Sequence, residues 1–432
     1  MNGPAFSFTS RVRPVIEIGI GAANVPTGLA LWDDARWDDP GALWAGDEPA
    51  WHEVTCDGIS ALIRRDRARN TDRFTPAECT IEVENITGWA DGTSSADVPG
   101  ELSLRPGRPI RVGVTHVTLG TFWRFRGTID SVTPKYDAEE TDTSTFVCTD
   151  VLGEVGRAKV TELDPSGAGE FAHDRFDRVL DAVPWLSSKR IVAMTGTTLV
   201  AGRLDGQVED LLGRIADSIG GACFGDVNGN VVLAGQEWQS YAEGADPDGT
   251  IGNTDPSDVC PSGWLRPFDR RDIATRVILD RELPADEAPA EPLVFDDQDG
   301  QVRYGVEPFE RLDLWTESDG RLTTIGSRIL VARGAGTMPR IEAVSLDAAN
   351  GDSTVDLMAQ MSVHKPSRYR CLLQLPRGEV FDADHFVTGL VETITPDSWE
   401  IEASMDLATP FMVGAGAEWD ENNGWDRSMW AA

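Results

Sequence analysis

The chain has 432 residues, 41% of them hydrophobic, which is more sequence than one ordinary core holds, so we expect a folded protein of several domains. Its net charge is −34, and a surface this acidic repels nucleic-acid phosphates, so we expect no sequence-specific binding of nucleic acid. No apolar run approaches the roughly 18 residues that a membrane span needs. We also expect no signal peptide and no association with a membrane.

The first feature along the chain is a segment rich in tryptophan and aspartate. "LWDDARWDDPGALWAG" (31–46) holds three tryptophans, and "AEWDENNGWDRSMWAA" (417–432) holds three more. Neither segment shows the alternation of a strand or the periodicity of an amphipathic helix, so its order must come from whatever its indole rings pack against. The candidate interface residues are therefore Trp32, Trp37, Trp44, Trp419, Trp425 and Trp430.

Most of the remaining sequence predicts β-strands. In "WEIEASMDL" (399–407) apolar residues alternate with polar ones, which is typical of a half-buried antiparallel strand. "CTIEVEN" (79–85) and "RYRCLLQL" (368–375) show a similar pattern. Polar stretches rich in glycine and proline, at 241–263 and 282–301, are predicted to be loops.

Two helices are predicted in the middle of the chain. Within 174–183 and 206–219, apolar residues recur at i, i+3, i+4 and i+7, and Gly220 is suited to a left-handed helix end. An Asn-Gly pair between two short apolar runs then predicts a hairpin over 222–235. We expect the apolar faces of both helices to pack on this hairpin as one α+β module.

An internal repeat is the most informative pattern. "FRGTIDSVTP" (125–134) and "VTGLVETITP" (387–396) align without gaps. A glycine permits close approach of a neighbouring strand, and a proline ends the hydrogen-bonded ladder. Two unrelated hairpins could resemble each other this much by coincidence, but we favour two related β-barrels, with residues 110–150 superposing on 368–408. The residues that define the repeat are Gly127, Pro134, Gly389 and Pro396.

Motifs for chemistry are absent from the sequence. The five histidines show no metal-binding spacing, and no nucleophile, phosphate-binding or dinucleotide-binding motif is present. The six cysteines form no CxxC pair, which favours buried free thiols. Aspartate-rich turns suggest calcium, but none continues into an EF-hand loop, so we interpret them as β-turns. We therefore predict no catalytic, cofactor or metal site, and no enzymatic activity.

Four stretches resemble the tail hub, or tail-associated minor tail proteins, of long-tailed (siphovirus-type) actinobacteriophages. The most distinctive is the helical module at 173–233, and the order of the stretches is more specific than any one of them. No lytic or sugar-binding domain is expected after residue 410. The four stretches are 51–85, 125–134, 173–233 and 386–410.

The resemblance implies a structural hub at the tip of the tail. Such a hub is a homo-trimer that joins a sixfold tail tube to a threefold tip, in contact with the distal tail protein, the tape measure protein and other tail-tip proteins. It would be assembled in the host cytoplasm and located in the virion. Three chains with two related barrels each would present six similar units to the tube.

The implied fold is mainly β, with an α+β module, two related β-barrel domains typical of phage tail hubs, and extended Trp-rich termini. The expected domains are an N-terminal strand and Trp-rich arm (1–50), a first β-barrel (51–156), the α+β module (157–263), a β-rich domain with long loops (264–345), a second β-barrel (346–410) and a C-terminal Trp-rich arm (411–432).

Alternatives remain open for the function and for the tryptophans. The chain could be a distal tail protein that forms a hexameric ring, which one barrel per chain would favour. It could instead be a virion-borne carbohydrate-binding or peptidoglycan-degrading protein, which carboxylates in a deep groove would favour. The tryptophans could staple the chain's own ends onto its barrels, anchor arms on neighbouring tail proteins, or stack on host sugars.

Overall fold

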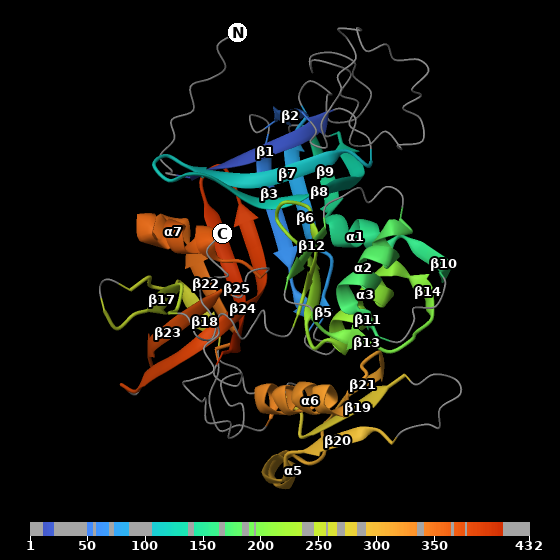
Figure 1. Ribbon diagram of the computed structural model, residues 1–432. Coiled ribbons are helices and arrows are strands. Elements are labelled where there is room, and N and C mark those ends of the chain that lie inside the picture. Colours follow the sequence, from blue (N-terminus) through green and yellow to red (C-terminus); the bar gives the residue numbers. More distant parts are fainter. Residues whose placement is uncertain are drawn as a thin grey trace, which may run out of the picture.

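The fold is mainly β, as the sequence predicts. It is built around one 13-stranded sheet, with smaller sheets and several helices packed beside it (Figure 1). The computed structural model describes residues 12–20, 50–54, 58–68, 73–85, 106–136, 142–163, 169–183, 190–193, 196–235, 246–255, 258–265, 273–282, 291–334, 341–363, 367–375 and 378–408.

The strands of the large sheet come from two parts of the chain, 12–149 and 249–407. They are β1 (Val12–Ile20), β2 (Ala50–Glu53), β3 (Gly58–Arg65), β6 (Glu78–Glu84), β7 (Pro109–His116), β8 (Gly120–Lys135), β9 (Thr143–Thr149), β17 (Gly249–Gly252), β18 (Gly263–Leu265), β22 (Ala343–Asp347), β23 (Arg368–Gln374), β24 (Val380–Ile394) and β25 (Trp399–Leu407).

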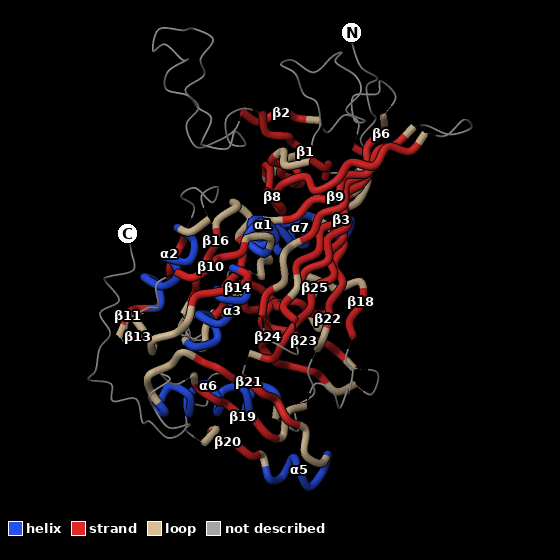
Figure 2. The backbone as a smooth tube through the Cα atoms, turned by 90° about the vertical axis from the view of Figure 1, so that its right-hand side faces the viewer, coloured by secondary structure: helices blue, strands red, loops and turns tan. Residues whose placement is uncertain are grey.

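The first half of this sheet has the order β3-β6-β9-β8-β7-β1-β2, and all its pairs are antiparallel. Within it, the long strand β8 pairs with β7 along its first part and with β9 along its last part. Strand β1 also contacts β3, so this half curls towards closure. In Figure 2, β3, β6, β8 and β9 run side by side as long strands.

The second half repeats this arrangement. The long strand β24 pairs with β23 along its first part and with β25 along its last part, both antiparallel. The pairing continues from β25 to β22 and β18, and from β23 to β17. An isolated bridge joins Ile251 on β17 to Val259, four residues before β18. The sequence predicts a loop for the stretch that contains β17, and it assigns that stretch to the module. In the structure, β17 pairs with β23 of the large sheet. Main-chain hydrogen bonds to a neighbouring strand can order even a polar, glycine-rich segment.

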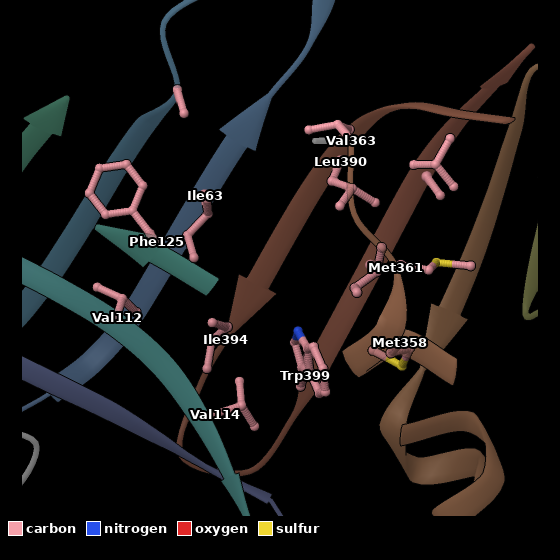
Figure 3. Packing of buried hydrophobic residues seen from close by; sticks show 14 of the residues in the cluster. Ile63, Val112, Val114, Phe125, Met358, Met361, Val363, Leu390, Ile394 and Trp399 are labelled. Carbon is pink, nitrogen blue, oxygen red and sulfur yellow. The ribbon is translucent and has the colours of Figure 1, made fainter. Parts of the chain in front are cut away.

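The two halves are parts of one sheet because β3 pairs with β24, with Ala61 opposite Ile394 and Arg65 opposite Leu390. Their buried side chains also form one continuous core cluster. Figure 3 shows Ile63, Val112 and Phe125 from the first half on one side, and Leu390, Met361 and Trp399 from the second half on the other. Ile394 and Val114 lie where the two sides meet (Figure 3).

The α+β module packs beside the first half. Its helices α1 (Val151–Gly156), α2 (Ala172–Asp181) and α3 (Val208–Ser218) share a core with the hairpin of β15 (Ala222–Gly225) and β16 (Val231–Ala234), so the predicted packing is confirmed. Gly220 has a φ of +65°, the left-handed helix end that the sequence predicts. Its other strands are β10 (Lys159–Leu163), β11 (Glu170–Phe171), β12 (Arg190–Ala193), β13 (Thr198–Leu199) and β14 (Leu204–Gln207).

A third unit corrects the β-rich prediction for 264–345. It has a sheet of β19 (Arg276–Arg281), β20 (Leu293–Asp296) and β21 (Pro308–Leu314), but also α5 (Gln298–Tyr304) and the longer α6 (Asp319–Arg333). Helix α6 forms because Leu322, Ile325 and Ile329 pack on that sheet. The remaining elements are β4 (Arg67–Ala68), β5 (Arg73–Phe74), η5 (Ala348–Asn350) and α7 (Asp352–Gln360).

Candidate functional site: the buried polar joints

A cluster of buried, hydrogen-bonded charged side chains lies where the two halves of the large sheet meet. We call such a cluster a joint. Glu392 on β24 is fully buried and accepts hydrogen bonds from Arg124 on β8, at 2.7 and 3.1 Å, and from Arg65 on β3, at 3.2 Å. The indole N–H of Trp399 donates to the same carboxylate at 3.3 Å. One carboxylate from the second half therefore holds two guanidinium groups from the first half.

Arg124 extends this joint to the C-terminal end of helix α7. Its two terminal nitrogens donate to the carbonyl oxygens of Ala359 at 3.1 Å and Met361 at 3.0 Å, so every part of the guanidinium has an acceptor. Burial lowers the pKa of Arg65, with the Glu392 carboxylate acting in the opposite direction. A buried charge is tolerated only when it is paired and hydrogen-bonded in this way, so the joint admits one relative placement of the two halves.

A second joint connects the module to its two neighbours. Asp217 near the end of α3 is buried and accepts two hydrogen bonds from Arg73 on β5, at 2.8 and 2.6 Å. Arg311 on β21 lies 3.4 Å from the other oxygen of the same carboxylate. Asp217 therefore links the short β4-β5 sheet, the module and the third unit through one side chain.

Trp315 strengthens the link between the module and the third unit. Its ring is fully buried, and the guanidinium carbons of Arg175 and Arg214 lie 5.0 Å and 4.8 Å from the ring centroid. Its indole N–H donates to Glu282 at 2.5 Å. A Cβ on Gly202 would lie 2.5 Å from the indole nitrogen, so that position has room only for glycine.

The glycines of the predicted repeat both lie against a neighbouring strand. A Cβ on Gly127 would lie 2.0 Å from the carbonyl oxygen of Thr149 on β9, and one on Gly389 would lie 3.2 Å from the Ser404 side chain on β25. Pro134 lies next to the last residue of β8, whereas Pro396 follows β24 in a turn. The superposition of 110–150 on 368–408 stays a prediction, supported by the shared strand pairing.

The six candidate tryptophans lie outside the described residues, so their contacts stay a prediction: Trp32, Trp37, Trp44, Trp419, Trp425 and Trp430. The sequence analysis missed the joints, although it offered a signal for two of their residues. Glu392 falls in phase with the buried Leu390 and Ile394, and Arg65 with the buried Ile63. A charged residue on the apolar side of a strand needs a buried partner.

Several titratable side chains in the described part are buried in the fold. His385 is buried, its pKa is lowered to about 4 by burial, and its Nε2 accepts a hydrogen bond from the Ile341 N–H at 3.1 Å. Cys79, Cys148, Cys223 and Cys371 are buried free thiols, whereas Cys260 is exposed. Within the described ranges, no group of three or more His, Cys, Asp or Glu side chains is placed to hold a metal ion.

The comparisons with known proteins find similarity in three-dimensional structure and none in sequence. No protein-family model matches the sequence, and no curated protein matches it.

Among the helices of the described residues, none has the length and apolar character to cross a membrane.

Two solved structures resemble the chain along almost its whole length. A tail protein from Neisseria meningitidis MC58 aligns with a TM-score of 0.57 and 12% identity, over 92% of this chain and 98% of that one. The 43 kDa tail protein of prophage MuSo2 from Shewanella oneidensis aligns with a TM-score of 0.57 and 11% identity, over 92% of this chain and 99% of that one. The chain therefore has the fold of these tail proteins.

Proposed function

We propose that this protein is a structural component of a bacteriophage tail tip, the hub that joins the sixfold tail tube to the threefold tip complex. The likeness in fold to two tail proteins over nearly the whole of each chain supports a role in a tail. The resemblance to the hubs of siphovirus-type actinobacteriophages supports the finer assignment. In this proposal the protein is not an enzyme and needs no cofactor.

The repeated strand arrangement is the observation that carries the hub assignment. The β7-β8-β9 and β23-β24-β25 arrangements share one pattern, in which a long central strand pairs with its predecessor and then with its successor. Closed assemblies of identical chains are the usual form of soluble oligomers. Three chains with two such arrangements each would offer six similar units to a sixfold tube, on a body of threefold symmetry.

The buried joints suit this role. A hub that presents two similar units at fixed positions needs a rigid connection between them within each chain. Arg65 and Arg124 in one half and Glu392 in the other supply a connection that any sliding of β24 along β3 would break. The expected partners are two further copies of the chain, the distal tail protein, the tape measure protein and other tail-tip proteins.

Stoichiometry in the assembled particle tests the proposal. We expect native mass spectrometry of the purified protein to detect a trimer, and cryo-electron microscopy of assembled tails to place three copies at the tip. Six copies in one ring would overturn the hub assignment in favour of a distal tail protein. A position away from the tip would contradict both assignments.

A cell-wall hydrolysis assay tests the non-enzymatic part of the proposal. The purified chain should release no soluble fragments from peptidoglycan under conditions in which a lysozyme control does. Release above the background of a heat-denatured sample would favour the peptidoglycan-degrading alternative.

A further inference from the structure

Two tryptophans and two arginines form a stack on the large sheet, at β2, β7 and β8. The guanidinium carbon of Arg111 lies 4.4 Å from the ring centroid of Trp51 and 4.1 Å from that of Trp123. The guanidinium carbon of Arg126 lies 5.3 Å from the Trp51 ring. We call these four residues, Trp51, Arg111, Trp123 and Arg126, the tryptophan–arginine stack.

The stack lies on the outer face of the sheet. The residues that alternate with Arg111 along β7, Ile110 and Val112, are fully buried in the core. All four residues of the stack are partly exposed, and the Arg111 side chain keeps 25% of its surface accessible. The Trp123 ring lies over Gly113, where a Cβ would come within 3.0 Å of a ring atom.

The charge of the stack differs from that of the chain as a whole. The chain carries a net charge of −34, whereas the stack contributes two guanidinium groups, and the Glu17 carboxylate lies 2.5 Å from Arg111. Tryptophan and arginine are the residues most enriched at the centres of protein interfaces. The complement of such a surface is a segment with exposed aromatic rings and carboxylates.

The sequence contains a segment of that chemistry. Residues 411–432 hold three tryptophans and four carboxylates, Glu418, Asp420, Glu421 and Asp426, against one arginine. The segment follows Ala408, the last described residue, and the 24 residues from 409 to 432 span up to roughly 80 Å when extended. Residues 31–46 have a similar composition, but they lie between β1 and β2 in the sequence, so both ends of that stretch belong to strands of its own molecule.

We propose that the tryptophan–arginine stack is the docking site for residues 411–432 of a neighbouring copy of this chain. The indoles of the segment extend the stack beyond Trp123 and Arg126, and its carboxylates pair with the two guanidinium groups. Like the proposed function, this inference requires several copies in one assembly, but it adds a named contact between them.

Binding of a synthetic peptide tests the proposal. The peptide 411–432 is titrated calorimetrically into the chain truncated after Pro410. We expect saturable binding, weakened about tenfold by Arg111→Ala or Arg126→Ala in the protein and about tenfold by Trp425→Ala in the peptide. Arg203→Ala removes the same charge from an exposed side chain of the module and should leave binding unchanged.

The controls separate docking from loss of the fold. Each protein variant is melted first, and a variant with a melting temperature below that of the truncated parent is replaced by Arg111→Lys, which keeps the charge but stacks less well. A scrambled peptide of the same composition should bind at least about tenfold more weakly. Equal binding of the two peptides, or an equal loss with Arg203→Ala, would overturn the docking site.

The full-length chain then tests whether the contact joins neighbouring copies. In the purified trimer, a photo-crosslinker at position 425 should join the segment to the stack of a different copy. A crosslink within the same copy would overturn the proposal. A trimer that forms without any such crosslink would also overturn it, but would leave the proposed function intact.

Discussion

Glu392 on β24 accepts a hydrogen bond at 2.7 Å from Arg124 on β8, a residue 268 positions earlier in the chain. The pair is buried on both sides, and Arg65 adds a second guanidinium to the same carboxylate. Among the described residues, Glu392 is the acidic side chain that accepts hydrogen bonds from Arg65 and Arg124, and the other acceptors of Arg124 are backbone carbonyls. The relative position of the two halves therefore depends strongly on this one residue.

Replacing Glu392 with glutamine should lower the free energy of unfolding by about 3 to 5 kcal/mol, because two buried guanidinium groups lose their counter-charge. Chemical denaturation followed by far-UV circular dichroism measures the change. Glu402→Gln on the neighbouring strand β25 is the matched control, since Glu402 is exposed, and it should change stability by less than about 0.5 kcal/mol. Similar results for the two variants would contradict the structural role of the joint.

The repeat glycines should form a graded series. Gly127→Ala should cost about 2 to 3 kcal/mol or more, because the new methyl group meets the backbone carbonyl of Thr149. Gly389→Ala should cost less, since the nearest atoms belong to the side chains of Asp66 and Ser404, which can shift. Gly196→Ala, with no atom within 4 Å, is the control and should be nearly neutral. Thermal melting of the three variants measures this order, and a neutral Gly127→Ala would show that β8 and β9 are not closely packed there.

The core of the module predicts the response to a buried carboxylate. Leu212 on α3 is fully buried, so Leu212→Asp should destabilise the protein by more than about 3 kcal/mol and reduce its solubility. Leu312 on β21 is 52% exposed, and Leu312→Asp is therefore a control that makes the same chemical change. Equilibrium unfolding and the soluble yield measure the difference. A soluble Leu212→Asp chain that melts with the parent would contradict the assignment of this core.

The buried carboxyl of Asp150 predicts a dependence on pH. Burial raises its pKa to about 6, although its Oδ1 accepts hydrogen bonds from the Leu152 and Gly153 N–H groups at the start of α1. The folded state therefore holds this proton at a pH where the unfolded state has released it, so its contribution to stability falls as the pH rises towards and through 6.

The variant Asp150→Asn lacks this proton but keeps an oxygen that accepts both hydrogen bonds. From pH 5 to pH 7, a range above the isoelectric point of about 4.4, the parent should lose about 1 kcal/mol of unfolding free energy relative to Asp150→Asn. Subtracting the two series cancels the other titrating groups, His385 included. A constant difference between the two proteins would show that Asp150 does not titrate in this window.

The sequence correctly predicted those strands and helices that show a clear pattern of apolar and polar residues within their own length. In β25, Trp399, Ile401 and Ala403 are buried and the glutamates between them are exposed, as the alternation predicts. Helices α2 and α3 and the hairpin after them follow from apolar periodicity and an Asn-Gly turn. These signals lie within a few neighbouring residues, so a single sequence contains them.

Other elements depend on contacts that are distant in sequence. Helix α6 contains Thr323, Thr324 and Gly326, which are poor helix formers, and it forms because Ser318 caps its start and the third unit's sheet covers its apolar side. The pairing of Arg65 with Glu392 could not be predicted, because no local pattern says which buried charge meets which. The contacts of the candidate interface tryptophans stay a prediction, because these residues lie outside the described ranges.

The pairing of β3 with β24 has a consequence for the synthesis of the chain. Arg65 leaves the ribosome 327 residues before Glu392, a delay of roughly 16 to 65 s at ordinary bacterial elongation rates. During that time β3 pairs with β6, and the edge of β3 that later pairs with β24 offers unpaired N–H and C=O groups to any neighbouring nascent chain. Several ribosomes translating one message would bring such edges together, so these nascent chains would be open to aggregation until β24 is made. Fragments that end before β24 should aggregate whenever they are expressed alone.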